Sequence, residues 1–317
     1  MKNVLKLIPM FIIVAVICTS CKPKPKTTTT ADPNASQHNE DVQNTKSESD
    51  NSNTDVNSAL TGTSGFGKNN SAIAINICGA TIDSSHQHDS PTPYLLINFD
   101  GSTVCSAPPR TRSGQVKVEL INGSAWINAG AQVRVTYTNY KVTFTTHNNA
   151  FVTFNGTKIL TDVSGVDWVA LLLAGQTSVT MTERTNNMMV TFENGATSSW
   201  NSARKYTWAY TLTGITATVD ADSISPTGKH IDSWGQTRFG TNFTTEMVVP
   251  WQSGSVCGWW APTQGEYTST TDNFSVTAQL GLDGNGNPIT SGCASSFRLS
   301  WTIAASNSSG SVVLGYL

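Results

Sequence analysis

The sequence predicts an all-β fold, either an antiparallel β-sandwich or one large curved antiparallel sheet, preceded by a signal peptide and a disordered tether. Three observations support this fold class. Apolar and polar residues alternate in many short segments, turn residues separate those segments at short intervals, and the helix formers Glu, Lys and Leu are sparse in the second half of the chain. Period-two alternation buries one face of a strand and leaves the other in water, which is the antiparallel pattern.

The alternating segments are short and regularly spaced, and dipeptides such as Asn-Gly and Asp-Gly lie between them. Many short strands joined by such turns favour a sandwich or a large antiparallel sheet. We expect the last segment to pair within the sheet, because a loose apolar tail would promote aggregation. The predicted strands are Ala72–Cys78, Gln115–Leu120, Gln132–Tyr137, Tyr140–Thr146, Ala150–Gly156, Ser178–Glu183, Met188–Gly195, Tyr206–Gly214, Thr216–Ala221, Phe274–Leu280, Phe297–Ile303 and Ser311–Leu317.

One apolar segment, Val163–Gln176, fits either a short helix or a fully buried strand, because periodicity does not separate the two. We predict a single all-β domain over residues 71–317, and a division into two sub-units near residues 215–230 remains open.

The first 20 residues have the organisation of a signal peptide. Lys2 and Lys6 form a positive segment, and the apolar stretch Leu7–Ile17 follows. That stretch is too short for a stable transmembrane anchor. The sequence therefore predicts export from the cytoplasm.

The small residues Thr19 and Ser20 precede Cys21 in the arrangement of a lipoprotein processing site. We expect Cys21 to become the lipidated, palmitate-bearing first residue of the mature chain. Cys18 occupies the position that usually holds Leu, and bulky residues before it make Cys18 itself a poor acceptor. The alternative is an ordinary secretory signal with a free product.

Residues 21–70 are predicted to be a flexible, low-complexity tether, because they lack aromatic residues and apolar runs until Phe66. Such a chain of about fifty residues has an r.m.s. reach of about 40 Å. Lys22, Lys24 and Lys26 would lie against anionic head groups beside the lipid anchor.

Composition argues against nucleic acid as a partner. The net charge is −2 and only 13% of residues are charged, whereas nucleic-acid-binding domains carry a basic excess. The partners we expect are the membrane, through the lipid anchor, and a glycan or an envelope protein.

Four cysteines remain beyond the signal region, Cys78, Cys105, Cys257 and Cys293. An even number in an exported chain indicates disulfides, and three pairings are possible. We favour Cys78–Cys105 and Cys257–Cys293, because each pair lies close in sequence, and each bridge would contribute about 3 to 4 kcal/mol. A four-cysteine metal site is the alternative, although no C-x-x-C spacing supports it.

The chain resembles a group of Bacteroidota lipoproteins of unknown function. The resemblance rests on Arg112–Val118, Val133–Val142 after Gly130, Phe154–Ser164, the stretch from Trp208 to Gly214, and the cysteine-containing end of the chain. It covers most of residues 75–301. The resemblance implies an all-β lipoprotein of the cell envelope, and it brings no activity. We expect the lipid anchor to lie in the outer membrane. Surface-displayed relatives often carry acidic residues after the lipidated cysteine, so the lysines here leave the periplasmic and the surface face both open.

The cluster formed by Asp83, His86, His88 and Asp89 is a candidate metal site. The His-x-His-Asp pattern places imidazole and carboxylate groups together, as Zn²⁺ or copper sites require. A polar loop tip before Pro91 is the alternative reading. A candidate Ca²⁺ loop starts at Asp283, but the position that would need Glu is Ala294, so a hairpin turn is favoured. We therefore expect no resident cofactor.

Tryptophan is abundant, with nine residues. Trp208 and Trp301 lie in alternating segments and are expected in the core. Trp259 and Trp260 are adjacent and cannot both face inward on a regular strand, so they are the candidate ligand-binding residues.

No nucleophile elbow, phosphate loop or dinucleotide motif is present. The leading hypothesis is an envelope lipoprotein whose β domain is structural or binds a ligand without catalysis, with no catalytic residue assigned. The alternatives are a glycan- or peptidoglycan-directed hydrolase, either with a metal at His86 and His88 or without one, and a carbohydrate-binding module.

Overall fold

Strands dominate the computed structural model, as the alternating segments predict. The structure describes residues 33–66, 76–106, 109–145, 150–165, 178–211, 214–258 and 261–316. In β4 (Ala131–Phe144), buried Val133, Val135 and Tyr137 alternate with side chains that are more exposed. The alternation therefore orients each strand with one face towards the core.

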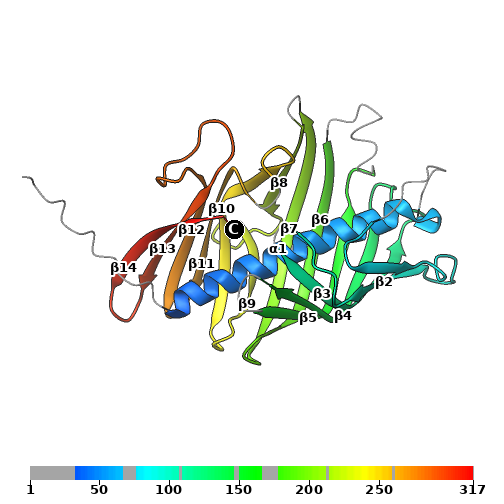
Figure 1. Cartoon of the computed structure of the whole chain (residues 1–317), viewed down its shortest axis with the longest axis horizontal. Coiled ribbons are helices and arrows are strands. Elements are labelled where there is room, and N and C mark those ends of the chain that lie inside the picture. The colour runs from blue at the N-terminus through cyan, green and yellow to red at the C-terminus, as the bar shows by residue number, and fades with distance from the viewer. Residues whose placement is uncertain are drawn as a thin grey trace, which may run out of the picture. The chain divides into compact units, whose positions relative to one another are not determined.

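The strands join into one 14-stranded sheet in which every described pairing is antiparallel. Most strands pair with their neighbours in sequence (Figure 1). The large antiparallel sheet is thus the observed form of the predicted all-β fold. The other strands are β1 (Ala80–Asp83), β2 (Tyr94–Asp100), β3 (Arg110–Asn122), β5 (Phe151–Asp162), β6 (Ser178–Phe192), β7 (Thr197–Thr211), β8 (Gly214–Ala221), β9 (Ile231–Gln236), β10 (Asn242–Gly254), β11 (Gln264–Thr271), β12 (Phe274–Leu282), β13 (Ser296–Ile303) and β14 (Ser308–Gly315).

Two short strands, β8 and β9, together occupy the single strand position between β7 and β10. On β7, residues 204–211 pair with β8 and residues 199–202 pair with β9. On β10, residues 251–254 pair with β8 and residues 242–246 pair with β9. β8 and β9 therefore lie end to end between the same two neighbouring strands, and the segment that connects them interrupts the pairing there.

The long helix α1 (Pro33–Gly62) lies across one face of the sheet, and the short helix η1 (Ser64–Phe66) follows it (Figure 1). We call the face of the sheet that α1 covers the helix-side face, and we call the opposite face the outer face. The prediction of a flexible tether is wrong for Pro33–Gly62. The segment has few apolar residues, but ion pairs and hydrogen bonds to the sheet take the place of an apolar helix face.

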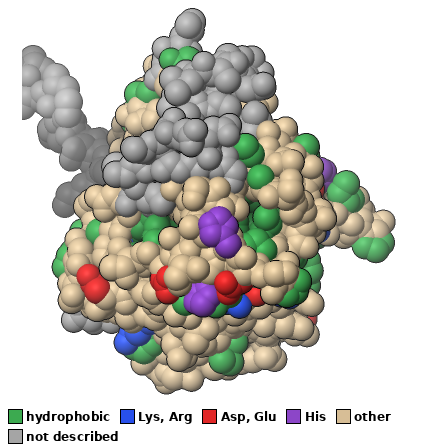
Figure 2. All heavy atoms as spheres, turned by 90° about the vertical axis from the view of Figure 1, so that its right-hand side faces the viewer, with side chains coloured by type: hydrophobic (Ala, Val, Ile, Leu, Met, Phe, Trp, Pro, Cys, Tyr) green, Lys and Arg blue, Asp and Glu red, His purple; other side chains and the backbone are tan. Residues whose placement is uncertain are grey.

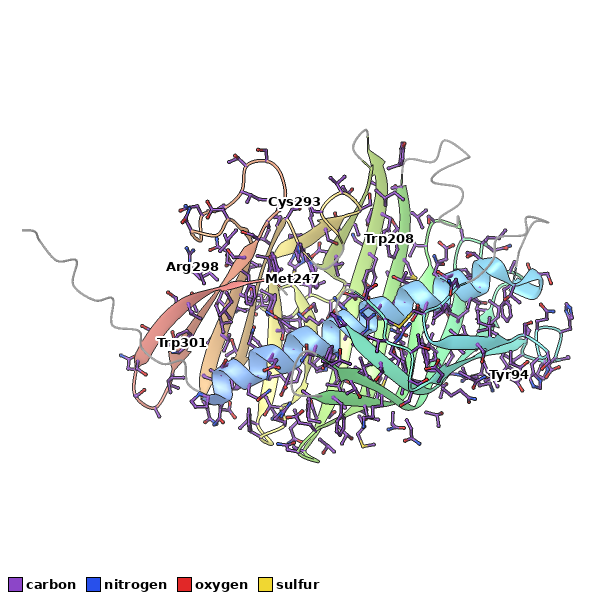
Figure 3. The ribbon with its side chains drawn as sticks, in the orientation of Figure 1. Tyr94, Trp208, Met247, Cys293, Arg298 and Trp301 are labelled. Atoms are coloured by element: carbon purple, nitrogen blue, oxygen red, sulfur yellow. A yellow bond between two sulfur atoms is a disulfide. The ribbon has the colours of Figure 1, made fainter. Side chains whose placement is uncertain are left out.

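Apolar side chains of the sheet and a few from α1 form the core. Val42, Val56 and Leu60 of α1 are completely buried. Trp208 and Trp301, labelled in Figure 3, are also buried, which confirms their predicted core positions. The core is therefore built mainly from strands, and the helix adds apolar contacts at a few points along its length.

Several predicted strands are parts of longer ones. Gln132–Tyr137 and Tyr140–Thr146 are predicted separately, yet β4 runs through both to Phe144. The pairing of β4 with β5 is irregular between Tyr137 and Tyr140, where Asn139 adopts a φ of 48°. A bulge of this kind interrupts the alternation without ending the strand.

Other strands have no counterpart among the predicted segments, namely β1, β2, β9, β10 and β11. β10 contains Glu246 and Pro250 and bends at two register shifts, so its alternation is broken in the sequence. Of Ala72–Cys78, only residues 76–78 are described and they are not strand, and Val163–Gln176 lies outside the described residues after residue 165.

The C-terminal segment is tied into the sheet, as expected, because β14 pairs with β13 from Ser308 to Gly315. Both favoured disulfides are confirmed. Cys78–Cys105 connects the segments that flank β1 and β2, and Cys257–Cys293 connects the loop after β10 to the loop before β13.

Residues 31–317 form one compact unit. Within it, one edge of β8 pairs with β7 and the other edge pairs with β10. Among the helices in the described residues, none is long and apolar enough to cross a membrane.

Candidate functional site

The most extensive polar cluster lies between α1 and the helix-side face. Lys46 forms an ion pair of 2.6 Å with Asp232 of β9, and both side chains are almost completely buried. Arg204 of β7 donates to Asp50 at 2.8 Å. Burying these charges is tolerated because each one faces a partner of opposite sign.

Three acidic residues of α1 recur at a spacing of seven, Asp41, Glu48 and Asp55. Seven residues are about two helical turns, so these carboxylates share one helix face. Asp41 pairs with Arg238 at 2.6 Å, Glu48 with Arg110 at 3.0 Å, and Asp55 with Arg112. The acidic face of α1 thus meets two arginines of β3 and one from the turn between β9 and β10.

Glu183 of β6 is the centre of the cluster. Its carboxylate accepts hydrogen bonds from Asn53 at 2.7 Å, Ser202 at 2.8 Å and Ser49 at 3.0 Å, and Lys158 lies 3.4 Å away. Burial favours the neutral form, but Lys158, Arg204 and these hydrogen bonds outweigh it and lower the pKa of Glu183 to about 2. Glu183 is therefore ionised wherever the protein is folded near neutral pH.

Burial dominates elsewhere in the same cluster. It raises the pKa of Asp41 to about 6 despite the hydrogen bonds and charge of Arg238. It also lowers the pKa of His38 to about 4, with a contribution from Lys46, and His38 Nε2 lies 2.8 Å from Ser269 Oγ. The cavity beside Glu48 and Tyr137 measures about 20 Å³, room for one water molecule at most. No substrate fits there, so we assign this cluster a structural role.

The candidate metal residues lie in the turn before β2. His86 Nδ1 lies 2.8 Å from Asp89 Oδ2, and the His86 ring stacks on Tyr94 at 4.3 Å between centroids. His88 does not join this pair. Histidine and acidic side chains are visible at this end of the molecule in Figure 2, but the described residues contain no group of three or more His, Cys, Asp or Glu side chains that could hold a metal ion.

The loop that starts at Asp283 forms the predicted turn. The Asp283 carboxylate accepts the backbone N–H groups of Asn285 and Asn287, both at 2.9 Å. The Asp283 N–H also donates to the Asn287 carbonyl at 2.8 Å. Both oxygens of this carboxylate accept hydrogen bonds within the turn, since the Asn287 side-chain amide donates to the second one. The remaining candidates Cys21, Trp259 and Trp260 lie outside the described residues.

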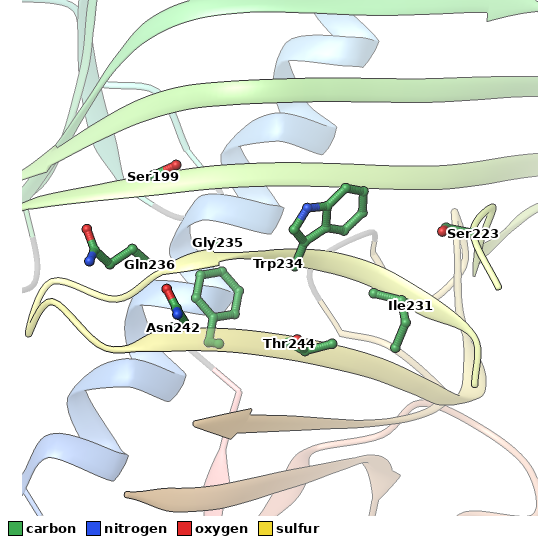
Figure 4. Close-up of a pocket in the computed structure, with 9 residues that line it drawn as sticks. Ser199, Ser223, Ile231, Trp234, Gly235, Gln236, Asn242 and Thr244 are labelled. Atoms are coloured by element: carbon green, nitrogen blue, oxygen red, sulfur yellow. The ribbon is translucent and has the colours of Figure 1, made fainter. Parts of the chain in front are cut away.

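A hollow of about 630 Å³ lies over β9, between β7 and β10 (Figure 4). Trp234, Gln236, Asn242 and Thr244 line it together with Ser199, Ser223, Ile231, Gly235 and Phe243. We call this the β9 hollow. The half-buried indole of Trp234 leans from β9 towards β7. None of the lining side chains carries a charge, and the volume is in the range of small-ligand sites.

Strand register brings the polar side chains of the β9 hollow together. Gln236 pairs with Ser199 of β7 on one side and with Asn242 of β10 on the other. Trp234 pairs with Thr244. Residues directly opposite each other on antiparallel strands point to the same face, so two cross-strand rows converge on one site.

Gly235 allows β9 to approach β7 closely. Its φ is 151°, and a Cβ atom there would lie 1.9 Å from the carbonyl oxygen of Ser199. Only glycine fits at this position without moving the two strands apart. The shape of the β9 hollow depends on this contact.

The sequence analysis did not find the β9 hollow or the buried cluster. The seven-residue spacing of Asp41, Glu48 and Asp55 is a signal for an acidic helix face, although low hydropathy concealed it. Trp234 followed by Gly235 has no comparable signal, because its partners come from β7 and β10.

Comparison of the chain with protein-family models, curated proteins and solved structures found no match.

Proposed function

We propose that this chain is an exported, lipid-anchored envelope lipoprotein whose β unit binds a ligand without transforming it. The N-terminal pattern that ends at Cys21 supports lipidation. The two disulfides support an oxidising compartment such as the bacterial envelope. The resemblance to Bacteroidota lipoproteins remains an expectation in the same direction.

The uncharged lining of the β9 hollow is the observation that carries the non-enzymatic part of this proposal. General acid–base and nucleophilic catalysis need titratable or activated side chains at the reacting atoms. The described lining contains Ser, Thr, Asn, Gln, Trp, Phe, Ile and Gly, and no basic residue lies within it to activate a hydroxyl. The hollow is therefore equipped for recognition by contact and hydrogen bonding.

Because α1 belongs to the β unit, the segment between the anchor and the unit is shorter than the tether predicted over residues 21–70. Only residues 22–32 lie between Cys21 and the start of α1. Such a segment spans at most about 40 Å when fully extended. His38, near the start of α1, contacts Ser269 of β11 and Phe274 of β12. The start of α1 is therefore tied to the sheet, and residues 22–32 set the greatest distance between the anchored Cys21 and the β unit.

The anchor is tested by substituting Cys21. We expect the wild-type chain to incorporate a palmitate analogue and to sediment with membranes, and Cys21→Ser to do neither. Cys18→Ser is the matched control and should behave as wild type. Equal labelling of the wild type and Cys21→Ser would refute the anchor.

A further inference from the structure

Polar side chains on the two faces of β7, β9 and β10 are used differently. On the helix-side face, Ser202 donates to Glu183 at 2.8 Å and Thr245 donates to Ser269 at 3.1 Å. In the β9 hollow, the side chains of Ser199, Asn242 and Thr244 make no hydrogen bond to any other described residue. The helix-side groups hold the fold together, whereas the groups in the hollow remain available to a ligand.

Trp234 supplies a flat apolar surface beside these groups. Its backbone carbonyl accepts a hydrogen bond from Asn201, whereas its indole N–H has no partner among the described residues. The row that contains Gln236 lies two residues along β9, a distance of about 7 Å. The aromatic face and the row of amide and hydroxyl groups are therefore separated by about 7 Å, which is about the width of one sugar ring.

The two basic residues that flank β9 in sequence, Lys229 and Arg238, are already paired. Lys229 and Glu246 form an ion pair of 2.6 Å, and Arg238 joins Glu193 at 2.7 Å and Asp41 at 2.6 Å. An anionic or cationic ligand would find no complementary charge in the lining. A purely apolar ligand would leave the side chains of Ser199, Asn242 and Thr244 without partners.

We propose that the β9 hollow binds a neutral saccharide, with one sugar ring stacked on the indole of Trp234. A pyranose ring presents C–H groups on its face and hydroxyl groups around its edge, and each hydroxyl both donates and accepts. The face matches the negative π surface of Trp234, and the edge matches the available side chains of Ser199, Asn242 and Thr244. This inference rests on the proposed binding function and names its ligand class.

The test uses the full chain in detergent and a panel of neutral oligosaccharides: cellohexaose, laminarihexaose, xylohexaose, mannohexaose and chitohexaose. We expect saturable binding of at least one of them by calorimetry, with a change in tryptophan fluorescence. Trp234→Ala should weaken that binding about tenfold, and Trp234→Phe should keep part of it. Asn242→Ala should weaken it by a smaller factor.

Tyr210→Ala is the matched control, because Tyr210 is an exposed aromatic residue on β7 outside the hollow lining. The affinity of Tyr210→Ala for the oligosaccharide should equal that of the wild type. If Trp234→Ala unfolds at the same temperature as the wild type, a loss of binding reflects the missing indole and not a loss of fold.

Two results would overturn the saccharide assignment: no binding of any of these oligosaccharides at millimolar concentration, or a folded Trp234→Ala that binds as the wild type does. Shortening of a bound oligosaccharide would instead contradict the proposed non-enzymatic function and leave the saccharide class standing. The two proposals can therefore fail separately.

Discussion

At the scale of residues, Glu183 shows how a buried charge is kept in this fold. Its carboxylate contacts groups from α1, β5 and β7, including Asn53, Lys158 and Ser202. No one of these contacts would offset the cost of burying the charge. Together they lower its pKa below that of an exposed Glu, so the ionised form stabilises the folded state.

Substituting Glu183 by Gln should therefore destabilise the protein. The pKa falls from 4.5 in the unfolded chain to about 2, which corresponds to about 3 kcal/mol of stability at neutral pH. Because the folded pKa is lowered, this contribution is complete above pH 4.5 and is lost as the pH falls through 2. Urea unfolding of both proteins from pH 7 to pH 2 measures the difference, which should shrink across that window.

Glu246→Gln is the control for this comparison, because the ion pair of Glu246 with Lys229 is exposed to solvent. An exposed pair is worth at most about 1 kcal/mol. A constant difference between the wild type and Glu183→Gln at every pH would contradict the assigned role of the carboxylate.

At the scale of elements, α1 is a helix that depends on its partner. Its sequence has few apolar residues and no single apolar face, so little drives it to fold alone. Its carboxylates and Lys46 find their partners only on strands that are distant in sequence. The helix and the sheet should consequently fold together.

Amide hydrogen exchange distinguishes this arrangement from a flexible tether. Backbone amides of residues 42–60 should exchange as slowly as those of β4 and β6, because opening the helix requires breaking buried ion pairs. A synthetic peptide of residues 33–62 should show little helix by circular dichroism. Complete exchange of this segment within seconds in the intact protein would show that α1 is not docked.

At the scale of the whole molecule, the two disulfides lie far apart in the sequence and connect different parts of the sheet. Cys78–Cys105 connects the segments that flank β1 and β2, and Cys257–Cys293 connects the β10–β11 loop to the β12–β13 loop. Both bridges close short loops, so they restrict the unfolded chain locally and leave the middle of the sheet to its own pairing.

Replacing both cysteines of one bridge by serine should cost about 4 kcal/mol in the free energy of unfolding. The Cys257→Ser/Cys293→Ser variant and the Cys78→Ser/Cys105→Ser variant should be affected to a similar degree, because their loops of 36 and 27 residues have similar closure entropies. Chemical denaturation of each variant and of the wild type measures the loss. Midpoints equal to that of the wild type would contradict this role for the bridges.

The sequence by itself determined the all-β class and the core positions of Trp208 and Trp301, and it favoured the two disulfide pairings that form. These features follow from local alternation and from cysteines close in the chain, so a short window contains the information. Tertiary structure alone decided that Pro33–Gly62 is a docked helix and that Trp234 lies in a hollow. Both depend on partners brought together by strand pairing, such as Arg204 for Asp50 and Thr244 for Trp234, and no local pattern specifies those partners.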